Sequence, residues 1–222
     1  MKIIYISGAN FPSEVSHTLS KMRMCQALAD EGHEVILSAF KNKVKVDDVM
    51  AYYGLLGGFN LNLINLPFWL NYKFIKNLQL HKLYAAVINR KIIQKFKPDL
   101  VYSRLTLQEL FLVPKAVPII YEMHSLGFLG KKRLARMLFR LLVSVKSFKY
   151  FISSTNTLSD LLKKSLPKNE VLVARLSAEL PIKIEANKIK NFRSNQLQGS
   201  EYRHHVGFTG YLDTVGLRGT EV

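Results

Sequence analysis

The chain has 222 residues, 48% of them hydrophobic, which suffices for one large core or for a domain with an appendage. Its single cysteine, Cys25, excludes a disulfide framework and offers no zinc-binding spacing. The 32 basic residues outnumber the 16 acidic ones and give a net charge of +16, which favours nucleic acid, an anionic membrane surface or a phosphorylated substrate as partner.

The apolar segments do not match a signal peptide or a membrane span. The N-terminal run of residues 1–7 is too short for a signal peptide. The uncharged segment 49–72 contains four asparagines, three glycines and Pro67, which a span in hydrocarbon tolerates poorly. We therefore expect a cytoplasmic protein.

Short apolar runs alternate with helical patterns along the chain. An amphipathic helix is predicted at residues 13–31, and Gly32 stands where a helix C-cap belongs. A long basic helix follows at residues 76–96. The predicted strands are residues 2–7, 35–39, 60–66, 100–103, 118–122, 150–153 and 171–174. This alternation predicts a doubly wound, Rossmann-like parallel α/β sheet of about seven strands with helices on both faces.

The composition changes beyond the seventh predicted strand. We expect a Rossmann-like domain over residues 1–182 and a polar, basic linker over residues 183–205. Residues 206–222 begin with the strand-like sequence VGFTG. Such a strand usually opens an α/β domain, because its edge and its apolar face need partners from later in the chain. This stretch is either a short tail on a finished protein or the first strand and loop of a second domain that is truncated.

Ligands of doubly wound sheets bind at the carboxyl ends of the strands. Gly8 and Ala9 follow the first predicted strand, and a glycine there suits the close approach of an anionic ligand to a helix N-terminus. A plain turn is an equal alternative. The dinucleotide fingerprint needs three glycines where this loop has one, so NAD binding is disfavoured.

Titratable residues gather at the same predicted edge. Glu122 and His124 end the fifth strand, where they could bind sugar hydroxyls or move a proton. The alternative is that Glu122 caps the next segment and His124 is a packed loop residue. His17 faces this edge from the first helix, or is simply an exposed helix residue. Arg104 follows the fourth strand and could meet a phosphate or a neighbouring carboxylate.

Residues 131–159 contain no acidic residue and include an amphipathic segment. Its basic residues, which we expect at an anionic membrane surface, are Lys131, Lys132, Arg133, Arg136 and Arg140. Its predicted apolar stripe is Leu134, Met137, Leu138, Leu141, Leu142, Val145 and Phe148. A basic residue near anionic lipid contributes about 1 kcal/mol of binding. The alternative is an ordinary helix that packs its stripe on the sheet and solvates its other face.

Five segments resemble a known family: MKIIYISGANFPSEVSH, KMRMCQALADEGHEV, KPDLVYSR, PIIYEMHS and FISSTNTLSDLL. Together they are similar to the N-terminal domain of GT-B glycosyltransferases of the family 4 type. The final VGFTGYLDTVGLRGTEV looks like the start of that family's second domain. The resemblance departs in the first loop, where many relatives carry two adjacent glycines and this chain has only Gly8.

The resemblance implies the acceptor-binding half of a retaining glycosyltransferase. The donor would be a nucleotide sugar, and the acceptor a polysaccharide or glycolipid at the inner face of the membrane, with no metal or cofactor. The residues it assigns are Glu122 and His124 to catalysis, Gly8, Ala9 and Arg104 to the donor, and His17 and Ser125 to the acceptor side. Most of the family's donor site is absent from the sequence, so we expect no activity from this chain alone.

Two other functions stay open. The chain could be a non-catalytic remnant or binding module with the same fold. It could also be a basic Rossmann-like domain that binds nucleic acid. The second alternative is weaker, because the sequence shows no helix-turn-helix, zinc finger or aromatic RNA-binding motif.

Overall fold

The computed structural model describes residues 1–44, 46–71, 80–104, 108–124 and 133–174. They belong to one compact unit, Met1–Leu176. The predicted linker and the predicted strand of residues 206–222 lie outside the described residues, so the predicted domain boundaries stay predictions. No helix in the described part of the chain is long and apolar enough to cross a membrane.

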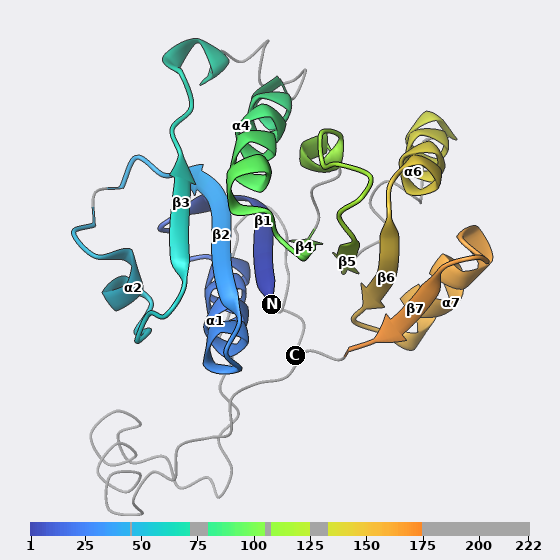
Figure 1. The fold of residues 1–222 in the computed structure, drawn as a ribbon, viewed down its shortest axis with the longest axis horizontal. Coiled ribbons are helices and arrows are strands. Elements are labelled where there is room, and N and C mark those ends of the chain that lie inside the picture. The colour runs from blue at the N-terminus through green and yellow to red at the C-terminus, as the bar shows by residue number, and fades with distance from the viewer. Residues whose placement is uncertain (45, 72–79, 105–107, 125–132, 175–222) are drawn as a thin grey trace, which may run out of the picture. The chain divides into compact units, whose positions relative to one another are not determined.

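Seven strands form one parallel sheet in the order β3-β2-β1-β4-β5-β6-β7 (Figure 1). The strands are β1 Lys2–Phe11, β2 Glu34–Lys41, β3 Asn60–Ile64, β4 Leu100–Arg104, β5 Ile119–Met123, β6 Phe148–Ser153 and β7 Glu170–Val173. The chain builds outward from β1 in one direction as far as β3 and then in the other direction from β4. This order confirms the predicted doubly wound sheet and places its topological switch point between β1 and β4.

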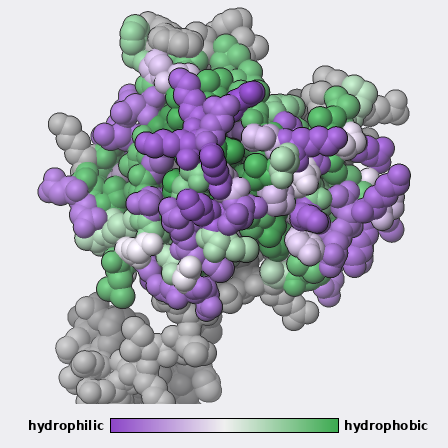
Figure 2. Space-filling view, viewed as in Figure 1, coloured by the Kyte–Doolittle hydropathy of each residue, from purple (hydrophilic) through white to green (hydrophobic). Residues whose placement is uncertain are grey.

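Helices cover both faces of the sheet. On one face lie α1 (Ser16–Asp30) and α2 (Val49–Tyr52), whose apolar residues pack with β1 and β2. The other face packs against α4 (Leu80–Phe96), α6 (Arg133–Val145) and α7 (Asn156–Ser165). Two short 3-10 turns, η1 (Phe68–Asn71) and η2 (Gln108–Leu110), complete the described elements. Figure 2 shows hydrophilic side chains over much of the visible surface, with apolar patches between them.

Alternating strand residues build the two cores. Ile4 and Ile6 join the core on the α4 side, whereas Tyr5 between them belongs to the α1 side. The Tyr5 ring stacks on Tyr102 of β4 with centroids 4.9 Å apart. Each large apolar side chain buried in this way contributes roughly 1.5–3 kcal/mol to the transfer free energy. The same alternation decides which polar side chains share a face at the strand ends.

β1 is longer than the sequence predicted. It runs to Phe11, and its register with β2 shifts between Ile6 and Asn10. Gly8 therefore lies inside an irregular strand, where the sequence predicted a turn after Ser7. Pairing with β2 on one side keeps this segment extended, which a local glycine signal could not reveal.

The buried face of α6 also differs from the predicted stripe. Phe139, Leu142 and Val143 are buried in the core on the α4 side of the sheet. Phe148, which was assigned to the helical stripe, begins β6. The side chains of Leu134 and Leu138 lie outside the described residues.

Three members of the predicted stripe face solvent instead. Met137, Leu141 and Val145 are 59%, 57% and 50% exposed. They are spaced four residues apart, so they form one ridge along the helix. The helix is apolar on two sides, and the periodicity could not tell which of them meets the sheet.

α1 ends in a Schellman motif, as Gly32 predicted. Gly32 adopts φ +79°, and its N–H donates to the Ala29 carbonyl at 2.9 Å. The His33 N–H donates to the Leu28 carbonyl at 3.1 Å. This left-handed turn sends the chain directly into β2.

Substitution Gly32→Ala should lower the free energy of unfolding by about 1 kcal/mol, because a side chain disfavours the left-handed conformation. No heavy atom lies within 4 Å of a Cβ built at Gly32, so steric contact adds nothing. Urea unfolding measures the change. Gly32→Asn is the matched control and should lose less, since asparagine tolerates this conformation. Equal losses in both variants would contradict a backbone origin.

Candidate functional site

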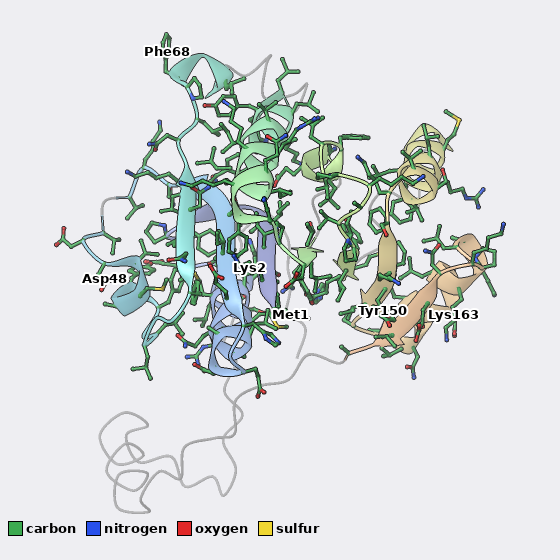
Figure 3. All side chains as sticks on the ribbon, viewed as in Figure 1. Met1, Lys2, Asp48, Phe68, Tyr150 and Lys163 are labelled. Atoms are coloured by element: carbon green, nitrogen blue, oxygen red, sulfur yellow. The ribbon has the colours of Figure 1, made fainter. Side chains whose placement is uncertain are left out.

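The switch point brings three polar strand residues into register. Ser7 of β1 pairs with Arg104 of β4, and Arg104 pairs with Glu122 of β5. All three are at least nine-tenths buried. Register partners in a sheet point to the same face, so these side chains share the α1 side at the carboxyl end of the sheet. Met1 and Lys2, labelled in Figure 3, mark the opposite, amino end of β1.

Glu122 has a partner on each carboxylate oxygen. Tyr102 Oη donates to Oε2 at 2.8 Å, and His124 Nε2 hydrogen-bonds to Oε1. Arg104 Nε lies 3.9 Å from Oε1. Burial alone would raise the pKa of Glu122, but the His124 and Tyr102 hydrogen bonds and the Arg104 charge outweigh it and lower this pKa. Glu122 is therefore an ionised, oriented carboxylate.

The contact with Glu122 orients the ring of His124. A carboxylate on one ring nitrogen selects the tautomer and stabilises the imidazolium that forms when the ring takes up a proton. Tyr102 stays a donor, because burial first and then the nearby Glu122 raise the pKa of its phenol. The structure thus places Glu122 and His124 together, and their catalytic roles stay predictions.

Lys21 belongs to the same cluster, although the sequence analysis did not select it. It lies on α1, is 4% exposed, and its Nζ donates to Ser7 Oγ at 3.0 Å. Burial, and then the charge of Arg104, lower the pKa of Lys21 to about 8 against the opposing effect of Glu109 and Glu122. A sequence signal exists in retrospect. The buried residues of α1 are Thr18, Lys21, Met22 and Cys25, so the lysine stands on the apolar side of the helix.

His17 and Ser20 lie on α1, within electrostatic or hydrogen-bonding range of Arg104. Arg104 Nη1 donates to Ser20 Oγ at 3.3 Å, and both Ser20 and His17 are exposed on α1. Partial burial, followed by the charges of Lys21 and Arg104, lowers the pKa of His17 and so favours its neutral ring. The structure therefore gathers His17, Arg104, Glu122 and His124 from the predicted set.

A second buried carboxyl group, Glu109 in η2, was also missed. Glu109 is 1% exposed, and its Oε1 has no hydrogen-bond partner among the described residues. Burial raises its pKa to about 7, while Lys82 and Lys21 oppose the shift. A glutamate in a short turn gives no sequence signal for such burial. Glu109 and Glu122 thus have opposite pKa shifts near one lysine.

Of the other predicted site residues, the structure describes Gly8, Ala9 and Arg140, and the rest lie outside the described residues. Gly8 is half-buried and Ala9 is buried in β1, with the Ala9 N–H donating to Ser7 Oγ at 3.2 Å. Arg140 is exposed on α6, away from this cluster on the other side of the sheet. The residues outside the description are Ser125, Lys131 and Lys132, together with the side chains of Arg133 and Arg136. The described residues contain no cluster of three or more His, Cys, Asp or Glu suited to a metal ion.

Comparisons by sequence gave no match: no family model and no curated protein is similar to this chain. The fold is similar to solved structures. A glycosyltransferase from Rickettsia africae matches with a TM-score of 0.58 and 14% identity over 90% of this chain and 50% of that one. The Neisseria meningitidis UDP-GlcNAc 2-epimerase bound to UDP-GlcNAc matches with a TM-score of 0.52 and 17% identity, covering 78% and 45% of the two chains.

The Phytolacca americana UGT2 structure, complexed with UDP-2fluoro-glucose and pterostilbene, has a TM-score of 0.54 and 11% identity, with coverages of 83% and 55%. The chain thus spans about half the length of each of these structures. The similarity confirms the predicted Rossmann-like α/β fold and supports a GT-B-like architecture.

Glu109→Gln should remove a pH-dependent loss of stability. Because the pKa of Glu109 rises from 4.5 to about 7 in the folded chain, its stabilising contribution is complete below pH 4.5 and is lost as the pH rises through 7. That shift corresponds to roughly 3 kcal/mol. The variant should therefore gain stability relative to wild type between pH 5 and pH 8, measured by urea unfolding.

The exposed Glu14 provides the matched control. Glu14→Gln should show no such gain between the two pH values. A Glu109→Gln variant with a pH-independent difference from wild type would mean that Glu109 ionises normally in the folded chain.

Proposed function

We propose that this chain is the acceptor-side half of a retaining glycosyltransferase that uses a nucleotide-sugar donor. The observation that carries the proposal is the Glu122–His124 pair, held by Tyr102 and Arg104 at the switch point. One of the similar structures is a glycosyltransferase, from Rickettsia africae, and another, the Phytolacca americana UGT2, contains UDP-2fluoro-glucose. The proposed acceptor is a polysaccharide or glycolipid at the inner face of the membrane.

The polar cluster suits the chemistry of glycosyl transfer. An acceptor hydroxyl must give up a proton as its oxygen attacks the sugar carbon. His124 takes this proton, and the ionised Glu122 stabilises the resulting imidazolium. Gly8, Ala9 and Arg104 face the donor phosphates in this proposal. On the acceptor side are His17 and Ser125.

The donor-side wall of the site comes from a second domain in this proposal. The matched structures are about twice as long as the part that this chain covers. Residues 1–182 form the acceptor-side domain, and residues 206–222 begin the donor-side domain. Sugar transfer in this proposal requires the complete cleft, which both domains form. The alternative, a non-catalytic module, predicts no transfer from the completed cleft.

His124→Ala should reduce sugar transfer by at least about tenfold, since a positioned acid–base group contributes 10²–10⁴-fold. The assay joins this chain to the donor-side half of the Rickettsia africae glycosyltransferase. It supplies a panel of UDP-sugars and a bacterial lipid extract, and UDP binding verifies that the chimera is assembled. His33→Ala, a histidine directly before β2 at the opposite edge, should keep full activity.

Both variants should melt within a few degrees of wild type, which separates catalysis from folding. A folded, UDP-binding chimera that transfers none of the sugars would contradict the proposed function. Unchanged turnover in His124→Ala would reduce His124 to a packing residue.

The proposed membrane association rests on α6. Its exposed ridge of Met137, Leu141 and Val145 lies on the helix that also carries the exposed Arg140. A helix that exposes apolar side chains beside basic ones binds the interface of anionic bilayers. The proposed location is therefore peripheral, at the cytoplasmic face.

Replacement of Lys132, Arg136 and Arg140 by glutamine should weaken binding to vesicles rich in phosphatidylglycerol. Wild-type protein should sediment with these vesicles and be released as salt rises, because exposed charges are screened within ~8 Å at physiological ionic strength. Equal binding to neutral phosphatidylcholine vesicles would contradict the electrostatic contribution.

The matched control removes the same charge elsewhere. Lys43, Lys95 and Lys97 are exposed outside α6, and their replacement by glutamine should leave vesicle binding near the wild-type level. If both triple variants lose binding equally, net charge and not α6 governs the association.

A further inference from the structure

The polar cluster at the switch point carries more positive charge than its carboxylate neutralises. Lys21 is 4% exposed and Arg104 is 8% exposed, so two cations from α1 and β4 are buried within electrostatic range of each other. Glu122 is the ionised carboxylate that faces them. Its two oxygens already bond to Tyr102 and His124.

Arg104 has unused hydrogen-bonding capacity. Its Nε lies 3.9 Å from Glu122 Oε1, beyond hydrogen-bonding distance, and has no hydrogen-bond partner in the described part of the chain. Within the described ranges, its Nη1 donates to the hydroxyl of Ser20 at 3.3 Å. A guanidinium group has five N–H donors, and a buried donor without an acceptor is costly. The side chain is therefore poised for an additional acceptor.

Lys21 is in a similar state. Its ammonium donates to the neutral hydroxyl of Ser7 at 3.0 Å, and no carboxylate of the described residues lies within ion-pair distance of it. Glu109 and Glu122 act on Lys21 only at longer range. Burial of a cation without a direct counter-ion explains why its pKa falls to about 8.

We propose that Lys21 and Arg104 form a binding site for a phosphoryl group of the substrate, with Ser20 and His17 at its open rim. A phosphate presents several anionic oxygens, so it can accept from the guanidinium and the ammonium together. Ser20, whose hydroxyl accepts from Arg104 Nη1, and the nearby His17 are both exposed to solvent. The inference rests on the proposed function for the identity of the substrate, not for the existence of the site.

Two parts of a glycosyl-transfer reaction could provide this phosphate. One is the diphosphate of the nucleotide-sugar donor, and the other is the phosphate of a lipid acceptor. Both share the chemistry that Lys21 and Arg104 recognise. Inorganic pyrophosphate and monomeric dihexanoyl phosphatidylglycerol are suitable probes for the two sources.

The test is an NMR titration of the full 222-residue chain with each probe at pH 7. Wild type should show saturable shifts of amides in α1 and at the end of β4 with at least one probe. Lys21→Met should weaken that binding at least tenfold, and Arg104→Gln should weaken it similarly. Lys146→Met is the matched control. This lysine donates to the Val113 carbonyl at 2.6 Å, next to the amino end of β6, and its loss should leave the affinity unchanged.

The pH dependence of probe affinity separates a binding role of Lys21 from a purely structural one. The groups near Lys21 are His17, Arg104, Glu109 and Glu122. Glu109, with a pKa of about 7, is almost fully ionised by pH 8. Between pH 8 and pH 9.5 only Lys21 among them changes its charge substantially, so wild-type affinity should fall across this range. Lys21→Arg should bind across the whole range, because arginine keeps its charge. Retained binding in Lys21→Arg, together with lost binding in Lys21→Met, would show that the positive charge and not folding is responsible.

Each outcome decides one question. Pyrophosphate binding assigns the site to the donor, and binding of the short-chain lipid assigns it to the acceptor. Binding of neither probe, or undiminished binding in folded Lys21→Met, overturns the proposal. Phosphate binding that depends on Lys21, in a chain whose chimera transfers no sugar, would overturn the glycosyltransferase function and leave the phosphate site standing.

Discussion

The register between β1 and β4 is the constraint on which the candidate site depends. These two strands meet where the chain order of the sheet reverses, and their pairing sets Ser7 beside Arg104. The next pairing adds Glu122 to the row. A slip of one residue would turn each of these side chains to the opposite face, away from α1. The stacked Tyr5 and Tyr102, two residues upstream on the same face, favour the observed register.

Burial shifts the pKa values of Glu109, Lys21 and His17 toward the neutral form, whereas at Glu122 the local partners outweigh burial. Glu122 receives two hydrogen bonds and stays ionised in spite of burial. Glu109 has one oxygen without a hydrogen-bond partner among the described residues, and its pKa of about 7 leaves it half-protonated near pH 7. Two carboxyl groups whose pKa values are driven apart can take the roles of proton donor and charge stabiliser. Lys21 lies within the electrostatic range of both, so the protonation of the three groups is coupled.

The sequence predicted the strands well because they are short apolar runs bounded by polar turns. That pattern also pointed to Glu122 and His124, because ligands of parallel sheets bind at the carboxyl ends of the strands and these two residues stand at such an end. Lys21 needed a different observation, namely a charged residue on the apolar side of a helix. The burial of Glu109 depends on packing between η2 and residues distant in sequence, which local patterns do not encode. The exposed ridge of α6 was misplaced for a related reason, because a helix with two apolar sides has no unique inward face.

The net charge of +16 favours any anionic partner, so the choice between partners depends on where the charges lie. Exposed basic residues such as Arg140 act through solvent, where salt screens them, so they attract any anionic surface without distinguishing its chemistry. Lys21 and Arg104 act in a buried environment, where screening is weak and an anion must satisfy specific donors. They belong to the α1 side of the sheet, whereas α6 packs on the other. If both proposals hold, long-range attraction and selective recognition lie on opposite faces of one sheet.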